Sequence, residues 1–284
     1  MLICPTKSEI RAQVANLRRA GKTIGLVPTM GFLHDGHLQL VRRAIETSDA
    51  VIVTIFVNPT QFGPNEDLDK YPRDMERDLA LLRAEGVAAV FTPTPDEMYL
   101  PGADTVIDLP SLSGILQGEL RPGHFQGVAT VVTKLFNITQ PDLAVFGEKD
   151  FQQLTIIRRM VADLDQPVRI IGHPTAREAD GLAMSSRNVR LTPEHRATAP
   201  VLNRAMTLAA NQTDQTAEHL IQMMHAEISE KSDGQIKSLD IRDAVTLAAM
   251  TGPITRPAVI LLAVKFGEVL LIDQRVIGPE KDDL

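Results

Sequence analysis

Residues 27–37 read Val-Pro-Thr-Met-Gly-Phe-Leu-His-Asp-Gly-His, and this stretch joins a predicted strand to a predicted helix. Residues 22–27 form a short apolar run, and residues 38–45 carry apolar side chains at helical spacing. The stretch therefore predicts a strand, a glycine-containing turn and the start of a helix. A helix start offers N–H groups without intrahelical partners and a partial positive charge, so this junction favours an anion.

Two glycines and two histidines give this turn its chemical character. Gly31 and Gly36 let the backbone approach a ligand where a Cβ atom would obstruct it. A metal site built on His34 and His37 would need further ligands, and no nearby Cys or Glu at suitable spacing supplies them. Two surface histidines that cap a helix are the plain structural alternative. The glycines and the strand-to-helix position favour phosphate chemistry, because imidazole can donate to phosphate oxygens as charge builds.

Predicted strands and helices alternate through the first part of the chain. The run at residues 50–57 is continuous and β-branched, which is typical of a central parallel strand covered on both faces. Alternation of this kind implies parallel pairing with right-handed crossovers, so we expect an α/β fold with a doubly wound parallel sheet. The predicted strands are 23–28, 50–57, 87–91, 143–146 and 168–171, and the predicted helices are 9–19, 37–47, 74–85, 130–138 and 151–164.

Three polar loops follow strands of this sheet, at residues 28–37, 58–63 and 146–150. Open α/β sheets bind ligands beyond the carboxyl ends of their strands. We therefore expect the three loops to converge on one crevice.

The pattern changes after about residue 176, which divides the chain into domains 1–175 and 176–284. Long helical segments are followed here by strands, and the last two strands are joined through Gly267 as a hairpin. We expect a smaller C-terminal α+β domain with an antiparallel sheet, and a frayed acidic end at 280–283. The predicted helices are 193–210 and 214–231, and the predicted strands are 236–241, 259–265 and 269–272.

Composition excludes several classes of protein. The 284 residues are 44% hydrophobic and 23% charged, as in ordinary globular proteins. A net charge of −7 argues against a nucleic-acid partner and a membrane surface, since both need basic faces. The single cysteine, Cys4, excludes an internal disulfide framework and is expected to be a small apolar side chain near the first strand. No apolar run is long enough for a membrane span, and we expect a cytoplasmic protein.

Two further segments carry polar groups at predicted turns. Lys149 could reach an ATP phosphate, and Asp150 could equally well cap the helix that follows. The loop at 184–188 combines two hydroxyls with a guanidinium, which suits a polyphosphate, although a plain serine-rich loop is the alternative. The amides of Gln61 and Gln153 suit a substrate with hydroxyl and carboxylate groups. The turn at 121–125 has functional and structural interpretations of equal weight.

These segments resemble the pantothenate synthetase family of the nucleotidyltransferase superfamily, which carries HIGH-type and KMSKS-type signatures. The resemblance rests on residues 27–31, 56–59, 121–125, 146–154 and 180–188 and runs in order over nearly the whole chain. It implies a Rossmann-like ATP- and pantoate-binding domain, a C-terminal lid domain and a homodimer. It also implies a two-step reaction in which ATP with Mg²⁺ and (R)-pantoate give pantoyl adenylate and pyrophosphate. β-Alanine then displaces AMP to form pantothenate.

The resemblance also assigns site residues, with the protein ligands of Mg²⁺ left unknown. Thr60 stands where we expect methionine, and Ala176 replaces a larger aliphatic residue; neither change removes a polar group that the chemistry needs. The implied catalytic residues are His34, His37 (the proposed proton donor), Lys149 and Arg187. The implied ATP-binding residues are Met30, Gly31, Phe32, Leu33, His34, Asp35, Gly36, His37, Gly147, Glu148, Lys149, Asp150, Ala176, Met184, Ser185, Ser186 and Arg187. Pantoate is assigned to Gln61, Gln153, Met30 and His124, and β-alanine to Gln61.

Three alternatives come from other classes. Another nucleotidyltransferase would join AMP to a phosphorylated cofactor precursor instead of pantoate. A tRNA synthetase is disfavoured by the acidic balance and by the lack of a basic RNA-binding domain. A non-enzymatic nucleotide sensor would bind ATP without turnover.

Overall fold

The computed structural model describes residues 1–64, 66 and 68–279 and divides into two compact units. Unit 1 comprises Met1–Gly147 and Ile156–His173, and unit 2 comprises Glu148–Thr155 and Pro174–Leu284. The sequence placed a single boundary between residues 175 and 176, and that domain division stays a prediction. The acidic stretch expected to fray lies outside the described residues.

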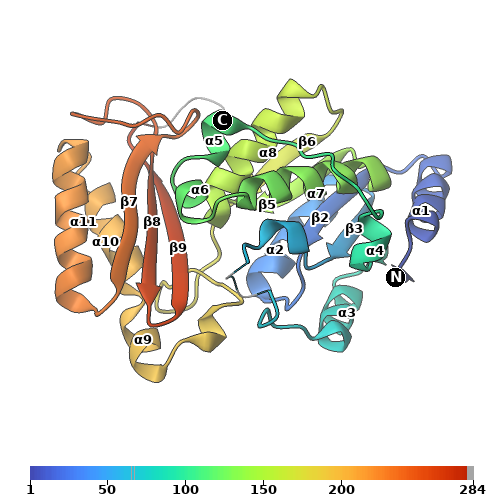
Figure 1. Cartoon of the computed structure of the whole chain (residues 1–284), viewed down its shortest axis with the longest axis horizontal. Helices are drawn as coiled ribbons and strands as arrows, with labels where there is room; N and C mark the ends of the chain where they lie inside the picture. The colour runs from blue at the N-terminus through green and yellow to red at the C-terminus, as the bar shows by residue number, and fades with distance from the viewer. Residues whose placement is uncertain (65, 67, 280–284) are drawn as a thin grey trace. The chain divides into compact units, whose positions relative to one another are not determined.

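Unit 1 is built on a parallel sheet (Figure 1). Among the described residues it has six strands in the order β1-β4-β3-β2-β5-β6, and every pair is parallel. The predicted doubly wound α/β class is confirmed, while the edge strand β1, which holds Cys4, was not predicted. The strands are β1 (Leu2–Cys4), β2 (Ile24–Thr29), β3 (Ala50–Ile55), β4 (Ala89–Phe91), β5 (Leu143–Gly147) and β6 (Arg169–His173).

The helices of this part of the chain follow local signals at their ends. Thr6 and Glu9 form a reciprocal capping box, so the first helix starts before the predicted residue 9. The helix predicted at 130–138 already starts at His124, where the left-handed Gly123 ends the preceding turn. The helices are α1 (Lys7–Arg19), α2 (Asp35–Thr47), α3 (Met75–Ala84), α4 (Pro95–Met98), α5 (Pro110–Ser113), α6 (Gln117–Leu120), α7 (His124–Thr139) and α8 (Phe151–Asp163), with short 3₁₀ turns η1 (Pro59–Gln61) and η2 (Glu148–Asp150).

Strand order places a switch point between β2 and β5. The chain continues from β2 to β3 on one side, and it returns later to place β5 on the other side. Helix α2 contacts β2, β3 and β5, while α7 lies across the strands in Figure 1 and contacts β2. Doubly wound sheets bind ligands at such a reversal, beyond the carboxyl ends of the strands. The turn after β2 and Gly147 at the end of β5 both lie at this edge.

The core of unit 1 explains why the continuous apolar runs are strands. All residues of β3 are buried, as expected for a central strand covered on both faces. Leu38, Val41 and Ala44 form the buried stripe of α2 and belong to one cluster with strand residues such as Val27 and Val53. This packing fixes the start of α2 at the edge of the sheet.

Unit 2 holds an antiparallel sheet in the order β7-β8-β9 (Figure 1). Gly267 has a φ of 56° in the turn between β8 and β9, so the predicted hairpin is confirmed. Helices α10 and α11 bury their apolar stripes in one cluster with this sheet. The strands are β7 (Gln235–Asp243), β8 (Ala258–Phe266) and β9 (Val269–Ile277), and the helices are α9 (Pro193–Thr198), α10 (Val201–Ala210) and α11 (Ala217–Lys231), with a 3₁₀ turn η3 (Asn188–Arg190).

The single helix expected over residues 193–210 is wrong. Helix α9 ends at Thr198 and α10 begins at Val201. Pro200 lies at the break, because proline has no N–H for the helical ladder, while Ala199 and Pro200 both keep helical backbone angles. Within the described ranges, no helix combines the length and the apolar character needed to cross a lipid bilayer.

Candidate active site

The turn after β2 is held in a conformation that needs glycine. Gly31 has a φ of 82°, and Phe32 follows with a φ of 50°. A Cβ atom on Gly31 would lie 2.9 Å from Ile55 Cγ2 and 3.0 Å from Asp78 Oδ2. Any larger residue at position 31 would therefore be strained and crowded at once.

Asp78 of α3 holds the backbone of this turn. Its Oδ2 accepts the Phe32 N–H at 2.7 Å and its Oδ1 accepts the Leu33 N–H at 2.8 Å. The side chain is 1% exposed, and burial raises the pKa of Asp78 although both backbone bonds favour the carboxylate. Arg77 donates to the Leu33 carbonyl at 2.9 Å and lies over the Phe32 ring. Helix α3 therefore fixes the backbone that leads to the histidines.

His34 and His37 lie together at the start of α2. His34 is the residue before the first turn, and its backbone N–H donates to His37 Nδ1 at 3.3 Å. The two ring centroids are 4.0 Å apart. Because Nδ1 accepts this bond, neutral His37 carries its ring proton on Nε2. The turn thus presents an N–H donor from His37 beside a second imidazole.

The carboxylate of Asp35 is engaged within the protein. It accepts from Gln39 at 2.8 Å and from Arg42 at 2.9 Å, and these bonds hold the pKa of Asp35 below its usual value. Arg42 also pairs with Glu85. A ligand bound at this turn would therefore have to compete with Arg42 for the Asp35 carboxylate.

Gln61 brings a second loop to the first. Its Nε2 lies 3.4 Å from Met30 Sδ, and its Oε1 accepts from Asn58 Nδ2 at 3.1 Å. Gln61 is 8% exposed, so its amide plane is held by these neighbours. The predicted approach of loops 28–37 and 58–63 is thus found within unit 1.

His124 contacts the backbone of Gln61 through one ring nitrogen. Its Nδ1 lies 2.8 Å from the Gln61 carbonyl and its Nε2 lies 3.1 Å from Arg121 Nη1. Nδ1 must donate to the carbonyl, so Nε2 accepts from the guanidinium. Arg121 also binds Glu66, and this pairing outweighs the effect of burial and holds the pKa of Glu66 below its usual value. Both ring nitrogens of His124 therefore have protein partners.

Three polar residues near Gln61 form a network that the sequence did not reveal as a site. Asn58 is 1% exposed, and its Oδ1 accepts from the Tyr99 hydroxyl at 2.8 Å and the Thr60 hydroxyl at 3.0 Å. Burial raises the pKa of Tyr99. A Cβ atom on Gly127 would lie 2.4 Å from the Thr60 carbonyl, so α7 packs directly on this loop. Thr60, which replaces the expected methionine, thus adds a hydroxyl bond to Asn58.

A cavity of about 380 Å³ lies at the same edge of the sheet. Met30 belongs both to its lining and to the contact with Gln61. In the described ranges, no three His, Cys, Asp or Glu side chains are grouped in a way that could hold a metal ion. The cavity is lined by Met30, Gly31, Phe32, Ile55, Phe56, Val57, Arg73, Asp74, Met75, Asp78, Pro93, Thr94 and Pro95.

The remaining predicted site residues, apart from Gly36 and Gly147, belong to unit 2. The Lys149 ammonium is 3.7 Å from the Asp150 carboxylate on η2, and Gln153 follows on α8. Ala176 accepts the Met184 N–H at 2.9 Å, which ties the predicted nucleotide residue to the predicted phosphate loop. Within that loop the Arg187 N–H donates to Ser185 Oγ at 3.2 Å. The structure thus gathers residues 176 and 184–187 in one segment of unit 2.

Comparison with known proteins gives a consistent result over nearly the whole chain. The family model for pantoate-beta-alanine ligase matches residues 2–276. The chain is 50% identical to the pantothenate synthetase of Bartonella henselae, covering 98% of this chain and 99% of that protein. It is 52% identical to the pantothenate synthetase of Agrobacterium fabrum, covering 99% and 97%.

Solved structures agree. The pantothenate synthetase of Thermus thermophilus superposes with a TM-score of 0.92 at 43% identity, over 97% of this chain and 99% of that one. The pantoate-beta-alanine ligase of Francisella tularensis, described as complexed with beta-gamma ATP and beta-alanine, gives a TM-score of 0.80 at 33% identity, over 97% of each chain. The sequence, the fold and these comparisons agree, and the chain belongs to the pantoate-beta-alanine ligase family.

Proposed function

We propose that this chain is an ATP-dependent ligase that condenses (R)-pantoate with β-alanine to pantothenate, through a pantoyl adenylate, with release of AMP and pyrophosphate. Family membership over residues 2–276 supports the overall reaction. The observation that carries the adenylate step is the His34–His37 pair at the start of α2, beside the switch point of the sheet. A helix start with an imidazole N–H donor suits the phosphates of ATP.

In the first step the pantoate carboxylate attacks the α-phosphorus of ATP and pyrophosphate leaves. We assign His34 and His37 to the phosphates, with Nε2–H of His37 as the donor whose bond strengthens as charge builds on the leaving group. Lys149 and Arg187 supply the fixed positive charges. Mg²⁺ bound with the nucleotide would offset phosphate charge, and it would be held largely through substrate phosphates and water.

Pantoate carries two hydroxyls and a carboxylate on a branched, methyl-bearing chain. We assign its polar groups to the amides of Gln61 and Gln153 and its apolar side to Met30, which lies against Gln61. His124 then acts on pantoate through the Gln61 backbone, because both of its ring nitrogens already have protein partners.

In the second step the amine of β-alanine attacks the acyl carbon of pantoyl adenylate, the C–N bond forms and AMP leaves. AMP is a good leaving group, so this step depends mainly on positioning, for which we assign Gln61. The nucleotide is assigned to residues 30–37, 147–150, 176 and 184–187. By resemblance, we further propose a homodimer, which sedimentation or light scattering would test.

ATP–pyrophosphate exchange with Mg²⁺, in the absence of β-alanine, tests this proposal. We expect exchange only when pantoate is present, and release of AMP when β-alanine is added. Exchange that depends on a phosphorylated precursor instead would indicate another nucleotidyltransferase. Folded protein that binds ATP without any exchange would indicate a sensor.

A further inference from the structure

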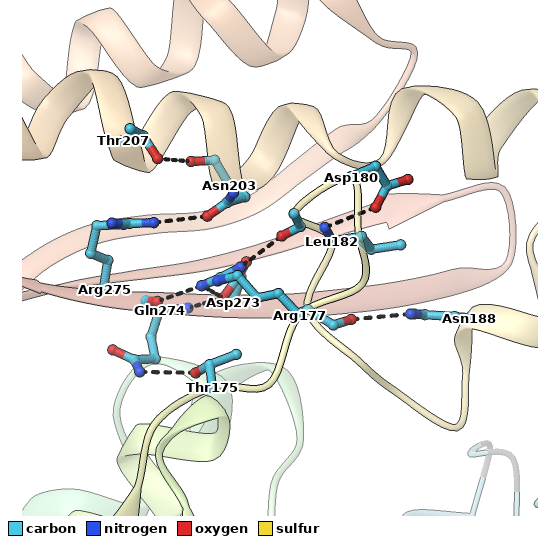
Figure 2. A network of polar contacts seen from close by, with 12 residues as sticks. Thr175, Arg177, Asp180, Leu182, Asn188, Asn203, Thr207, Asp273, Gln274 and Arg275 are labelled. Carbon is cyan, nitrogen blue, oxygen red and sulfur yellow. Dashed lines mark hydrogen bonds and ion pairs between the residues drawn. The ribbon is translucent and has the colours of Figure 1, made fainter. Parts of the chain in front are cut away.

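The segment that leads to Ser185 and Arg187 is bound by residues of β9, which lies much later in the sequence. Arg177 donates through Nη1 to Asp273 Oδ2 at 2.7 Å and through Nη2 to Asp273 Oδ1 at 2.9 Å (Figure 2). The two bonds form a bidentate ion pair, and the Asp273 side chain is 1% exposed. The geometry fixes the plane of the Arg177 guanidinium as well as its position.

The residue after Asp273 anchors the same segment at a second point. Gln274 Nε2 donates to Thr175 Oγ1 at 3.2 Å, and the Gln274 N–H donates to Asp273 Oδ1 at 2.8 Å. Gln274 is 5% exposed. Successive side chains of a strand point to opposite faces. Asp273 therefore binds Arg177 from one face of β9, and Gln274 binds Thr175 from the other. The start of the loop is therefore fixed to the sheet of unit 2.

The Asp273 carboxylate also offsets the charge of a second arginine, Arg275. Arg275 donates to Asn203 Oδ1 of α10 at 2.8 Å, and it lies near enough to Arg177 to be affected by its charge. Burial lowers the pKa of Arg275, and the Arg177 charge lowers it further while Asp273 acts in the opposite direction. Loss of the carboxylate would leave two neighbouring guanidinium groups without this compensation.

Hydrogen bonds and a backbone bridge connect Arg177 to the loop at residues 184–188. Arg177 Nη1 donates to the Gly181 carbonyl at 3.1 Å, and its backbone forms an antiparallel bridge with Ala183. Asn188 Nδ2 donates to Glu178 Oε1 at 2.8 Å and to the Ala183 carbonyl at 3.0 Å. Residues 176–188 thus form a closed hairpin, and Asp273 is its anchor in the sheet.

We propose that Asp273 is a positioning residue for adenylation, which acts through Arg177 to hold the loop of Ser185 and Arg187 in the geometry that binds the polyphosphate of ATP. This inference rests on the proposed function. Asp273 does not touch substrate. Its effect should therefore be confined to the half-reaction in which pyrophosphate leaves, since the second half-reaction uses no polyphosphate.

The test is Asp273→Asn, because asparagine keeps the shape but offers one acceptor and turns an NH₂ group toward the guanidinium. In pantoate-dependent ATP–pyrophosphate exchange we expect the KM for ATP to rise or kcat to fall by about 10- to 100-fold in total. The KM for pantoate should stay within about twofold, and so should the reaction of supplied pantoyl adenylate with β-alanine. Arg177→Lys keeps the charge but loses the bidentate geometry. It should also impair the kinetics with ATP while leaving the pantoate KM and the second half-reaction unchanged.

Asp243→Asn is the matched control. Asp243 is also a largely buried acid of unit 2 paired with an arginine, Arg256, but the partners of its carboxylate lie in and beyond the turn after β7, outside the hairpin at 176–188. Asp243→Asn should show the same pantoate-dependent ATP–pyrophosphate exchange as the wild type. Wild-type ATP kinetics in folded Asp273→Asn and Arg177→Lys would overturn the inference, as would an equal loss in both half-reactions. Absence of exchange in the wild-type chain would instead count against the proposed function.

Discussion

The backbone N–H of His34 donates to Nδ1 of His37, so the second histidine of the turn is oriented by the backbone of the first. This bond holds neutral His37 in the tautomer with its proton on Nε2. Protonation of Nδ1 would break it, since the nitrogen would then become a donor. The turn therefore selects both a ring orientation and a tautomer before any substrate arrives.

Substitutions of His37 should separate these two roles. Asparagine places an amide oxygen near the position of Nδ1 and can still accept the His34 N–H, but it supplies no donor at the position of Nε2. We expect His37→Asn and His37→Ala both to lower single-turnover adenylation by about 10²–10³-fold. The asparagine variant should keep more stability than the alanine variant in thermal unfolding.

Glutamine at position 37 provides the complementary control. Its amide NH₂ can reach toward the position of Nε2, so His37→Gln should retain more adenylation than His37→Asn. Wild-type single-turnover rates in the alanine variant would refute the role assigned to His37.

Asp78→Ala should weaken the turn that leads to the histidines. It removes the acceptor of two buried backbone N–H groups, at Phe32 and Leu33, and each unsatisfied donor costs about 1–3 kcal/mol. We expect a loss of about 2–5 kcal/mol in the free energy of unfolding, together with impaired pantoate-dependent exchange. Urea titration followed by the exchange assay measures both.

The control for Asp78 lies just before the same helix. Asp74 caps α3 by accepting the Arg77 N–H at 3.1 Å, so its bond stabilises the helix end and not the turn after β2. Asp74→Ala should cost about 1 kcal/mol, and although Asp74 also lines the cavity, we expect a smaller loss of exchange than in Asp78→Ala. Equal loss of exchange in the two variants would show that helix stability, and not the turn, is responsible.

Gln61→Ala should raise the requirement for pantoate while ATP binding survives. The variant removes the amide that lies against Met30 and is held by Asn58. We expect the pantoate KM to rise by about tenfold or more, with the Kd for ATP within about twofold. Calorimetry with each substrate separates the two, and unchanged pantoate affinity would contradict the assignment. Gln153→Ala should behave in the same way.

Acid should destabilise unit 2 in part through Asp243. Burial opposes its charged form, but the N–H groups of Thr246 and Val245 and the guanidinium of Arg256 outweigh this and lower the pKa of Asp243 from 3.8 to about 2. A lowered folded-state pKa contributes stability above the unfolded pKa and loses it as pH falls. The contribution is about 2 kcal/mol, present above about pH 4 and lost toward about pH 2.

Asp243→Asn makes this contribution measurable. The variant should be less stable than the wild type at neutral pH, and the difference should shrink as the pH falls from about 4 to about 2. Urea titrations across that interval would show it. A difference that stays constant with pH would exclude a role for ionisation of Asp243.

Local signals in the sequence predicted most of the fold. The β-branched run of β3 and the stripe of α2 were sufficient, because burial on both faces leaves a continuous apolar run and burial on one face leaves a periodic one. The break at Pro200 was missed because apolar spacing continues through it, although proline itself was the signal. Strand β1 was missed because three residues are too few to show a period.

Of the polar contacts described above, the sequence predicted the local turn of His34 and His37 and the approach of the Gln61 loop to it. The His34–His37 turn is local, so its strand, glycines and helix start could be recognised. Asp78 and Asp273 act on segments that lie far from them along the chain, and no local pattern distinguishes either from an ordinary surface acid. Their roles depend on burial and on backbone N–H or guanidinium partners that only the folded chain brings together.

Cys4 is buried in β1, and burial raises the pKa of its thiol, so little reactive thiolate is present. The native chain should therefore react little with thiol reagents, which allows an introduced cysteine to be labelled specifically. A cysteine introduced at the exposed Val189, just beyond the hairpin, would react selectively with a spin label or fluorophore. Such a probe would follow the loop at residues 184–188 directly, with and without nucleotide, in the wild-type and Asp273→Asn backgrounds.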